Sequence, residues 1–141
     1  MKKSKFIVLI LLVFSLNLIW EFSHYRLYID LTGIPSNIHL IIASFTDLFL
    51  VFFMFLIISI LKKSIKWIEN PKKSDYAIII ILGILIATII EIYSLLNGRW
   101  TYTNLMPTIF GIGISPLIQL SVTSIISLWL INIITIGKKK R

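Results

Sequence analysis

The chain contains no cysteine, which excludes disulfide bonds, thiolate nucleophiles and metal centres with cysteine ligands. Charge is also scarce, because Asp, Glu, Lys and Arg together make up only 14% of the 141 residues. Only six residues are acidic, whereas 57% of the chain is hydrophobic, a share above that of soluble globular domains. This composition excludes an ordinary soluble domain and predicts an integral membrane protein.

Four apolar runs are long enough to cross a bilayer as α-helices, which need about 20 residues each. They cover approximately residues 6–25, 38–61, 76–96 and 112–136. The runs leave too little chain for a soluble module. We therefore expect one all-α domain, residues 1–141, built as a polytopic bundle of four transmembrane helices.

Basic residues predict the orientation of the bundle. Of the 14 Lys and Arg residues, 12 fall in three groups, at the two termini and between the second and third runs. Cytoplasmic segments are rich in Lys and Arg, so we expect both termini inside a multi-pass protein of the cell membrane. The net charge of +8 then reflects contact with anionic lipid headgroups, and nucleic acid is not an expected partner. The groups are Lys2, Lys3 and Lys5; Lys62, Lys63, Lys66, Lys72 and Lys73; and Lys138, Lys139, Lys140 and Arg141.

Three acidic residues, Glu21, Asp47 and Glu91, lie inside the apolar runs. Each is about 14 to 15 residues from the cytoplasmic end of its run, which at about 1.5 Å per residue places all three about 20 Å deep. An ionisable group at that depth is energetically costly, so three at one level mark a candidate functional site. We take Glu91, Glu21 and Asp47 as the candidate catalytic residues.

Polar residues accompany these acids at helical spacing. Asn17, Glu21 and His24 follow one another at steps of four and three, which places them on one face of a helix. Such a stripe must face protein or water rather than lipid. His39 precedes Asp47 by about two helical turns. The candidate substrate-binding residues are Asn17, His24, His39, Arg99, Trp100, Tyr102 and Gln119.

A polar corner, Asn97-Gly98-Arg99-Trp100, follows the third run within two turns of Glu91. An arginine in this place can fold back over a carboxylate. We therefore expect Arg99 to orient Glu91 or to contact an anionic group of a ligand.

The start of the fourth run allows two interpretations. Ser115 is a suitable N-cap and Pro116 a suitable first helical residue, which would leave residues 103–114 as an apolar outer loop on or in the membrane surface. In the other interpretation the helix already begins near residue 112. The end of segment 103–115 is then part of the fourth helix. Otherwise the segment is a loop that lies on the membrane surface or re-enters the membrane.

Three chemical roles are open for the embedded acids. Proton transfer needs one carboxyl group that holds a proton and another that stays ionised, and it suits isomerisation, cyclisation or hydration of a lipid-soluble substrate. A metal site would add His24 or His39, but the spacing contains no established ligand motif, so we predict no metal ligands. In the third role the acids pair with Arg26, Arg99 or the histidines as structural ties between helices.

Segments 98–102, 106–107 and 113–117, with the sequences GRWTY, MP and GISPL, carry a resemblance. They resemble the small-residue, Trp-x-Tyr and Gly-x-Pro-Leu pattern of heterodimeric lycopene cyclase domains. In that family the proline-leucine step is followed by paired acids taken as catalytic, whereas Ile118 and Gln119 stand in those places here. The resemblance therefore implies no cyclase activity for this chain.

Segments 20–24 (WEFSH) and 98–102 (GRWTY) also resemble segments of uncharacterised small bacterial four-span membrane proteins. This second resemblance covers the whole chain. It implies a family and no particular activity.

Three functional classes follow from these patterns. Our first hypothesis is an enzyme-like protein that acts on a hydrophobic lipid or isoprenoid substrate by acid/base chemistry, which requires an apolar cavity that ends on the three acids. The second is an accessory or assembly subunit of a membrane complex, which requires a lipid-facing strip of small residues. The third is a small transporter that acts as a homo-oligomer, which requires a polar track toward the cytoplasm. The sequence names no cofactor.

Overall fold

The computed structural model describes residues 3–139, with the backbone alone for residues 135–139. Lys2, Lys140 and Arg141 of the basic groups lie outside the described residues. The chain is 77% helical, which confirms the all-α class.

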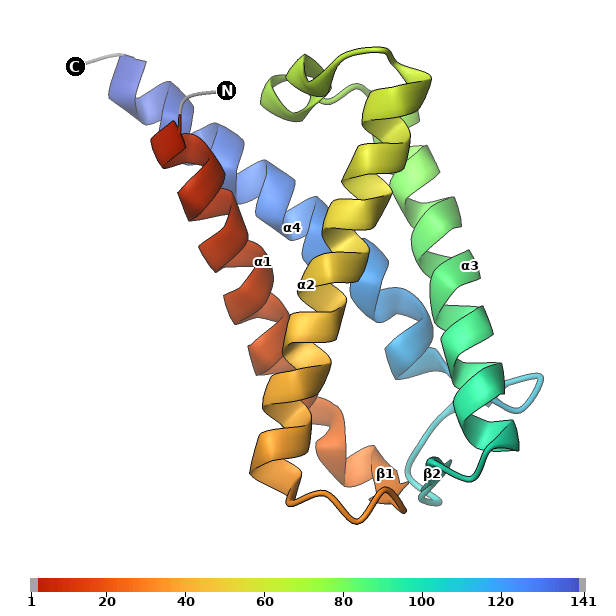
Figure 1. The fold of residues 1–141 in the computed structure, drawn as a ribbon. Helices are drawn as coiled ribbons and strands as arrows, with labels where there is room; N and C mark the ends of the chain where they lie inside the picture. Colours follow the sequence, from red (N-terminus) through yellow and green to blue (C-terminus); the bar gives the residue numbers. More distant parts are fainter. Residues whose placement is uncertain (1–2, 140–141) are drawn as a thin grey trace.

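Four long helices form the bundle: α1 (Lys3–His24), α2 (Ser36–Leu61), α3 (Lys73–Leu96) and α4 (Ile114–Lys139). All four are long and apolar enough to span a membrane, as a multi-pass membrane protein requires. Their ends lie within three residues of the predicted ones. Figure 1 shows the four helices side by side, with α1 and α2 in front of α4 and α3 beside α2.

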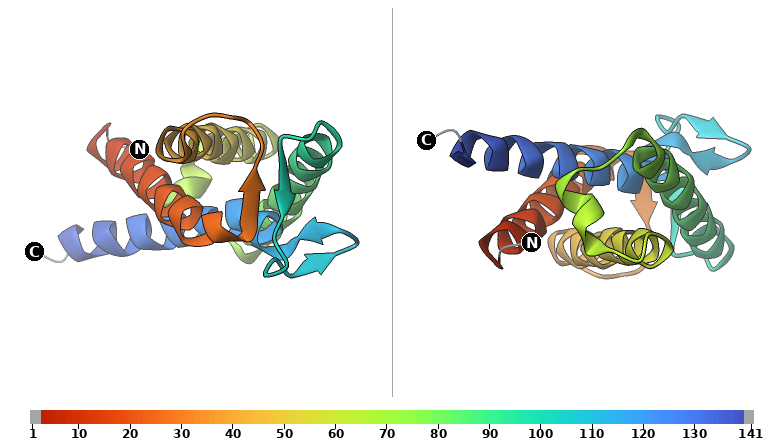
Figure 2. Two further views of the ribbon diagram at one scale, coloured as in Figure 1. Left: turned by 90° about the horizontal axis from the view of Figure 1, so that it is seen from below. Right: turned by 90° about the horizontal axis from the view of Figure 1, so that it is seen from above.

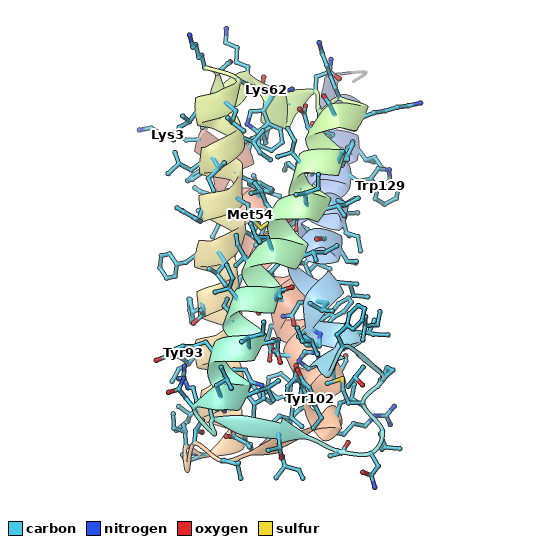
Figure 3. All side chains as sticks on the ribbon, turned by 90° about the vertical axis from the view of Figure 1, so that its right-hand side faces the viewer. Lys3, Met54, Lys62, Tyr93, Tyr102 and Trp129 are labelled. Atoms are coloured by element: carbon cyan, nitrogen blue, oxygen red, sulfur yellow. The ribbon has the colours of Figure 1, made fainter. Side chains whose placement is uncertain are left out.

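The two ends of the bundle differ in chemistry. Both chain termini and the connection between α2 and α3 lie at one end, and the short β-strands lie at the other (Figure 1). Lys3 and Lys62 mark the first end, whereas Tyr93 and Tyr102 lie near the second (Figure 3). We call these the basic end and the aromatic end.

An apolar core fills the half of the bundle next to the basic end. Val13, Met54, Phe55 and Leu128, from α1, α2 and α4, are almost completely buried. The short 3-10 helix η2 (Ile65–Glu69) adds Trp67 to this core and lies across the end of the bundle (Figure 2). This half of the bundle is therefore closed by apolar packing.

Polar contacts hold η2 and its neighbours in place. The Trp67 indole N–H donates to Ser59 Oγ at 2.9 Å, and Asn132 Nδ2 donates to the Ile68 carbonyl at 3.1 Å. Lys62, at the end of α2, forms an ion pair with Asp75 in the first turn of α3. These contacts tie α2, η2, α3 and α4 together at the basic end.

Helices α3 and α4 approach each other closely at Gly83. A Cβ atom added at Gly83 would lie 2.2 Å from Ser121 Oγ and 3.0 Å from the Ser121 backbone nitrogen. Ser121 Oγ also donates to the Ile80 carbonyl at 3.3 Å. Small residues at such a crossing let two backbones come together without bulky side chains between them.

Two short antiparallel ribbons occupy the aromatic end, and the sequence predicted neither. After the 3-10 turn η1 (Tyr25–Leu27), β1 (Tyr28–Asp30) pairs with β2 (Trp100–Tyr102), so that Tyr28 lies opposite Tyr102 and Asp30 opposite Trp100. Figure 2 shows this β1–β2 ribbon crossing the end of the bundle.

The second ribbon corrects the expectation for residues 103–115. β3 (Thr108–Ile109) and β4 (Ile112–Gly113) form a hairpin, so only the last two residues of this segment belong to the helix. The hairpin turn has positive φ at Phe110 and Gly111, as two-residue turns between twisted strands require. α4 begins at Ile114, so Ser115 lies inside the helix and the N-cap predicted there is wrong.

We expect Gly83→Ala to lower the stability of the protein by about 1–3 kcal/mol, the usual cost of overpacking. Alanine favours helices more than glycine does, so helix propensity alone would give the opposite sign. Ile81→Ala, at a position of the same helix that is 66% exposed, is the control. Thermal unfolding in detergent measures both variants, and a Gly83→Ala protein as stable as the wild type would contradict the close approach.

Candidate functional site

A cavity of about 240 Å³ lies in the half of the bundle next to the aromatic end. Side chains of all four helices and of the β1–β2 ribbon line it. Four of the six acidic residues are in its wall: Glu21, Asp30, Asp47 and Glu91. The three acids predicted at one depth thus face one cavity, together with apolar residues such as Ile90.

Gln119 of α4 joins two of these acids. Its amide nitrogen donates to Glu21 Oε1 at 2.7 Å and to Asp47 Oδ2 at 2.6 Å, and the Gln119 residue is only 4% exposed. Glu21 and Asp47 thus share one amide donor, and we call these two acids the Gln119-bridged pair.

Asn17 and Thr123 support Gln119 from the core side. Asn17 Oδ1 accepts from the Thr123 hydroxyl at 3.2 Å and from Gln119 Nε2 at 3.4 Å. Asn17 Nδ2 donates to the Val13 carbonyl at 2.9 Å. Asn17 is fully buried and lies below the cavity rather than in its wall, so it positions Gln119 instead of facing a ligand.

The side chain of His24, the last residue of α1, contacts the start of α4. Its Nε2 is 3.5 Å from Glu21 Oε2, and its Nδ1 is 2.8 Å from the Ser115 hydroxyl. His24 is 8% exposed and lines the cavity. The Gln119-bridged pair therefore has one imidazole beside it.

Glu91 is held by the β1–β2 ribbon. Its carboxylate accepts hydrogen bonds from the Trp100 indole N–H at 3.3 Å, from the Tyr28 hydroxyl at 3.5 Å and from the Tyr102 hydroxyl. Burial and the nearby Glu91 carboxylate raise the pKa of Tyr28 and the pKa of Tyr102 above the usual range of a phenol. Both phenols therefore keep their protons and remain donors.

The alternation of the ribbon explains why these donors converge. Residues two apart on a strand point to the same face, so Trp100 and Tyr102 share a face while Thr101 points away. Tyr28 lies opposite Tyr102 and belongs to the same face, whereas Ile29 is 49% exposed on the other. Tyr28, Asp30 and Trp100 thus line the end of the cavity, whereas Tyr102 bonds to Glu91 from outside the cavity wall.

Asp30 and His39 form a pair at the edge of the cavity. The His39 imidazole contacts the Asp30 carboxylate, which also accepts from the Thr32 hydroxyl at 2.7 Å and the Thr32 backbone N–H at 2.9 Å. Burial by itself raises the pKa of Asp30, but the hydrogen bonds from Thr32 and His39 outweigh it and hold the pKa below its usual value. His39 therefore faces Asp30 of the ribbon, not Asp47 two turns further along α2.

Arg99 differs from expectation. Its guanidinium lies 5.9 Å from the centre of the Trp100 ring, and its side chain is exposed at the cavity edge. Among the described residues, the partners of the Glu91 carboxylate are the three aromatic donors. The prediction that Arg99 orients Glu91 is thus wrong, because the ribbon brings Trp100 and Tyr102 over the carboxylate instead.

Tyr28, Asp30 and Ser94 line the cavity and were missing from the candidates predicted by sequence. A signal for the first two exists in the alternation of YID (28–30) and WTY (100–102), which is a strand pattern rather than a helical one. Both segments are too short to stand out beside apolar runs of about 20 residues. Ser94 lies one turn from Glu91 and is buried in the cavity wall.

Residues 3–139 contain no group of three His, Asp or Glu side chains placed to hold a metal ion. The carboxylates are instead occupied by amide, indole and phenol donors. Comparisons of the chain with protein-family models, with curated proteins and with solved structures give no match.

We expect Gln119→Leu to destabilise the protein by about 1–3 kcal/mol or more, because two buried carboxyl groups lose their shared donor. The same change in a Glu21→Gln, Asp47→Asn background should cost less, since no charge then remains beside the leucine. Thermal unfolding of the four proteins gives the coupling. Equal costs in both backgrounds would contradict the amide bridge.

The Asp30 contacts predict a pH dependence of stability. The native pKa of Asp30 lies below its unfolded value of about 3.9, so its contribution is complete above that value and is lost as the pH falls through the native pKa. Asp30→Asn should therefore lower the melting temperature at pH 7, with a difference that shrinks below about pH 4. A difference that stays constant from pH 7 to pH 3 would be the contrary result.

Proposed function

We propose that this protein is a membrane-embedded enzyme that acts on a hydrophobic substrate, of the lipid or isoprenoid class, by acid/base chemistry. The observation that carries the proposal is one cavity whose wall combines Glu21, Asp47 and Glu91 with apolar side chains from α2 and α3. Concave, largely apolar sites with a few convergent polar groups are the usual form of ligand sites.

The Gln119-bridged pair and Glu91 have different surroundings, so they suit different steps of a proton transfer. Glu21 and Asp47, joined by the Gln119 amide, are the proposed proton donor. Glu91 stands apart on α3, fixed by Trp100 and Tyr102, and is the proposed proton acceptor. Environments that separate the behaviour of two carboxyl groups are a recurring device of acid/base enzymes.

The surrounding bundle supplies what such chemistry needs. His24 beside Glu21 offers a route for reprotonation of the pair. The apolar core between the cavity and the basic end keeps water of that side away from the reacting groups.

The proposal includes a location and an orientation. Lys3, Lys62 and neighbouring lysines gather at the basic end, which by the positive-inside tendency is the cytoplasmic side of the cell membrane. The cavity then faces the outer leaflet, and the lipid bilayer is both the partner of the protein and the source of the substrate.

Two alternatives have less support. A transporter needs a polar path through the bundle, whereas the half next to the basic end is filled by residues such as Val13, Met54 and Leu128. An assembly subunit would present small residues to lipid, yet Ser121 and Ser124 are at most 5% exposed. The hypothesis that the acids are structural ties between helices has more support than these two, because Gln119 and the ribbon donate hydrogen bonds to the acids.

The test compares wild type, Glu91→Gln and Asp75→Asn in a host whose membrane lipids are profiled by untargeted mass spectrometry. Asp75→Asn is the matched control, since Asp75 is buried at the basic end, outside the cavity. Wild type and Asp75→Asn should produce a new or depleted lipid species. Glu91→Gln should lower that conversion about 100-fold or more, the usual contribution of a general acid or base.

Protein abundance is measured in the same membranes. A wild-type profile identical to that of the empty host would contradict enzymatic action in that host's lipids. Loss of abundance in Glu91→Gln without any change in lipids would identify the acids as structural ties.

A further inference from the structure

The cavity has an opening in the side of the bundle. Ile42 and Thr46 of α2 line the cavity, yet Ile42 is 49% exposed and Thr46 is exposed as well. Ile90 of α3, in the opposite wall, is also partly exposed. Figure 1 shows α2 and α3 diverging toward the β1–β2 ribbon. These exposed wall residues place the opening between α2 and α3, inside segments that are apolar enough to span a membrane.

The size of the cavity indicates what enters by this opening. At about 240 Å³ it is smaller than the usual pocket for a whole drug-sized ligand, about 300–1,000 Å³. A headgroup and the first part of a chain fit inside, while the rest of the chain stays in the bilayer. The side opening suits such a ligand because an acyl or alkyl chain can extend through it without leaving the hydrocarbon.

The charge of the wall indicates the headgroup. Four carboxyl groups line the cavity against one arginine, and Arg99 lies exposed over Trp100 at its edge. The hydrogen bonds printed for these acids come from neutral donors, the Gln119 amide for Asp47 and aromatic side chains for Glu91. A buried carboxylate without a cation is costly, so a positively charged group in the cavity would relieve that cost.

Ser94 supplies a free polar atom in the same wall. Several Ser and Thr side chains of these helices bond to the carbonyl four residues earlier, as Ser44, Ser59 and Thr88 do. Ser94 is 1% exposed, lines the cavity next to Glu91, and its hydroxyl has no hydrogen-bond partner among the described residues. A buried hydroxyl without a partner is a place where a ligand N–H can bind.

We infer that the cavity binds a long-chain amine, with its ammonium group between Glu91, Asp47 and the Ser94 hydroxyl and its chain passing between α2 and α3 into the bilayer. This inference names the substrate class of the acid/base site proposed above, and its catalytic meaning rests on that proposal. Binding itself requires no turnover and can be measured separately.

The experiment uses the full chain in phosphatidylcholine nanodiscs and three probes of equal chain length: hexadecylamine, hexadecan-1-ol and palmitate. Bound copies are counted by native mass spectrometry after release from the nanodisc. Hexadecylamine should bind about tenfold more tightly than the alcohol, and palmitate should not compete. Ser94→Ala should weaken amine binding about tenfold without loss of folding, since the hydroxyl has no partner to lose among the described residues.

A second pair of variants tests the side opening. Ile90→Trp fills the mouth of the cavity and should abolish hexadecylamine binding, whereas Ile89→Trp changes a neighbouring residue that is 60% exposed and outside the cavity wall. Glu91→Gln should weaken the amine and leave the weak binding of the alcohol unchanged.

Palmitate binding equal to or tighter than amine binding would overturn the inference, as would amine binding that is indifferent to Ser94→Ala and Glu91→Gln. Equal binding by Ile90→Trp and Ile89→Trp would overturn the side opening. Because these measurements involve no reaction, their failure leaves the lipid-profile result of Glu91→Gln intact, and the reverse also holds.

Discussion

The amide of Gln119 is the contact on which the polar half of the bundle depends. Carboxyl groups inside a bilayer need donors from the protein itself, because no water is present to replace them. One amide nitrogen serves Glu21 of α1 and Asp47 of α2 from α4, and Asn17 holds that amide in turn. Three helices are thereby joined at the floor of the cavity by a group that carries no charge. The amide binds both acids without supplying a neutralising cation, and acidic side chains outnumber Lys and Arg in the cavity wall.

The bundle divides into two halves with different physical purposes. Next to the basic end, Met54, Phe55 and Trp67 are buried in one apolar core, and the Gly83–Ser121 crossing brings α3 against α4. Next to the aromatic end, α2 and α3 diverge and polar groups replace apolar packing (Figure 1). The packed half supplies rigidity, so that the open half can keep a cavity without collapse. Stability and a binding site are thus supplied by different stretches of the same helices.

The sequence predicted the parts of this structure that depend on long patterns. The four spans and their ends follow from apolar runs, and Glu21, Asp47 and Glu91 stand out because acids are rare inside such runs. Helical spacing also placed Asn17, Glu21 and His24 on one face, where they lie near Gln119. The aromatic end could not be predicted in this way, since strands of two or three residues leave almost no periodic signal. The partners of Glu91 and of His39 come from those strands, so Arg99 over Glu91 was the natural expectation and the wrong one.

The β1–β2 ribbon makes the site sensitive to chain length rather than to side-chain identity alone. Tyr28, Trp100 and Tyr102 meet Glu91 because they share one face of a ribbon with a period of two. Deleting or inserting a single residue between α3 and Trp100 would turn that strand over and aim Thr101 at the carboxylate. Insertions and deletions in residues 97–99 should therefore be incompatible with a functional site. This holds although the segment is exposed and resembles a loop that tolerates changes of length.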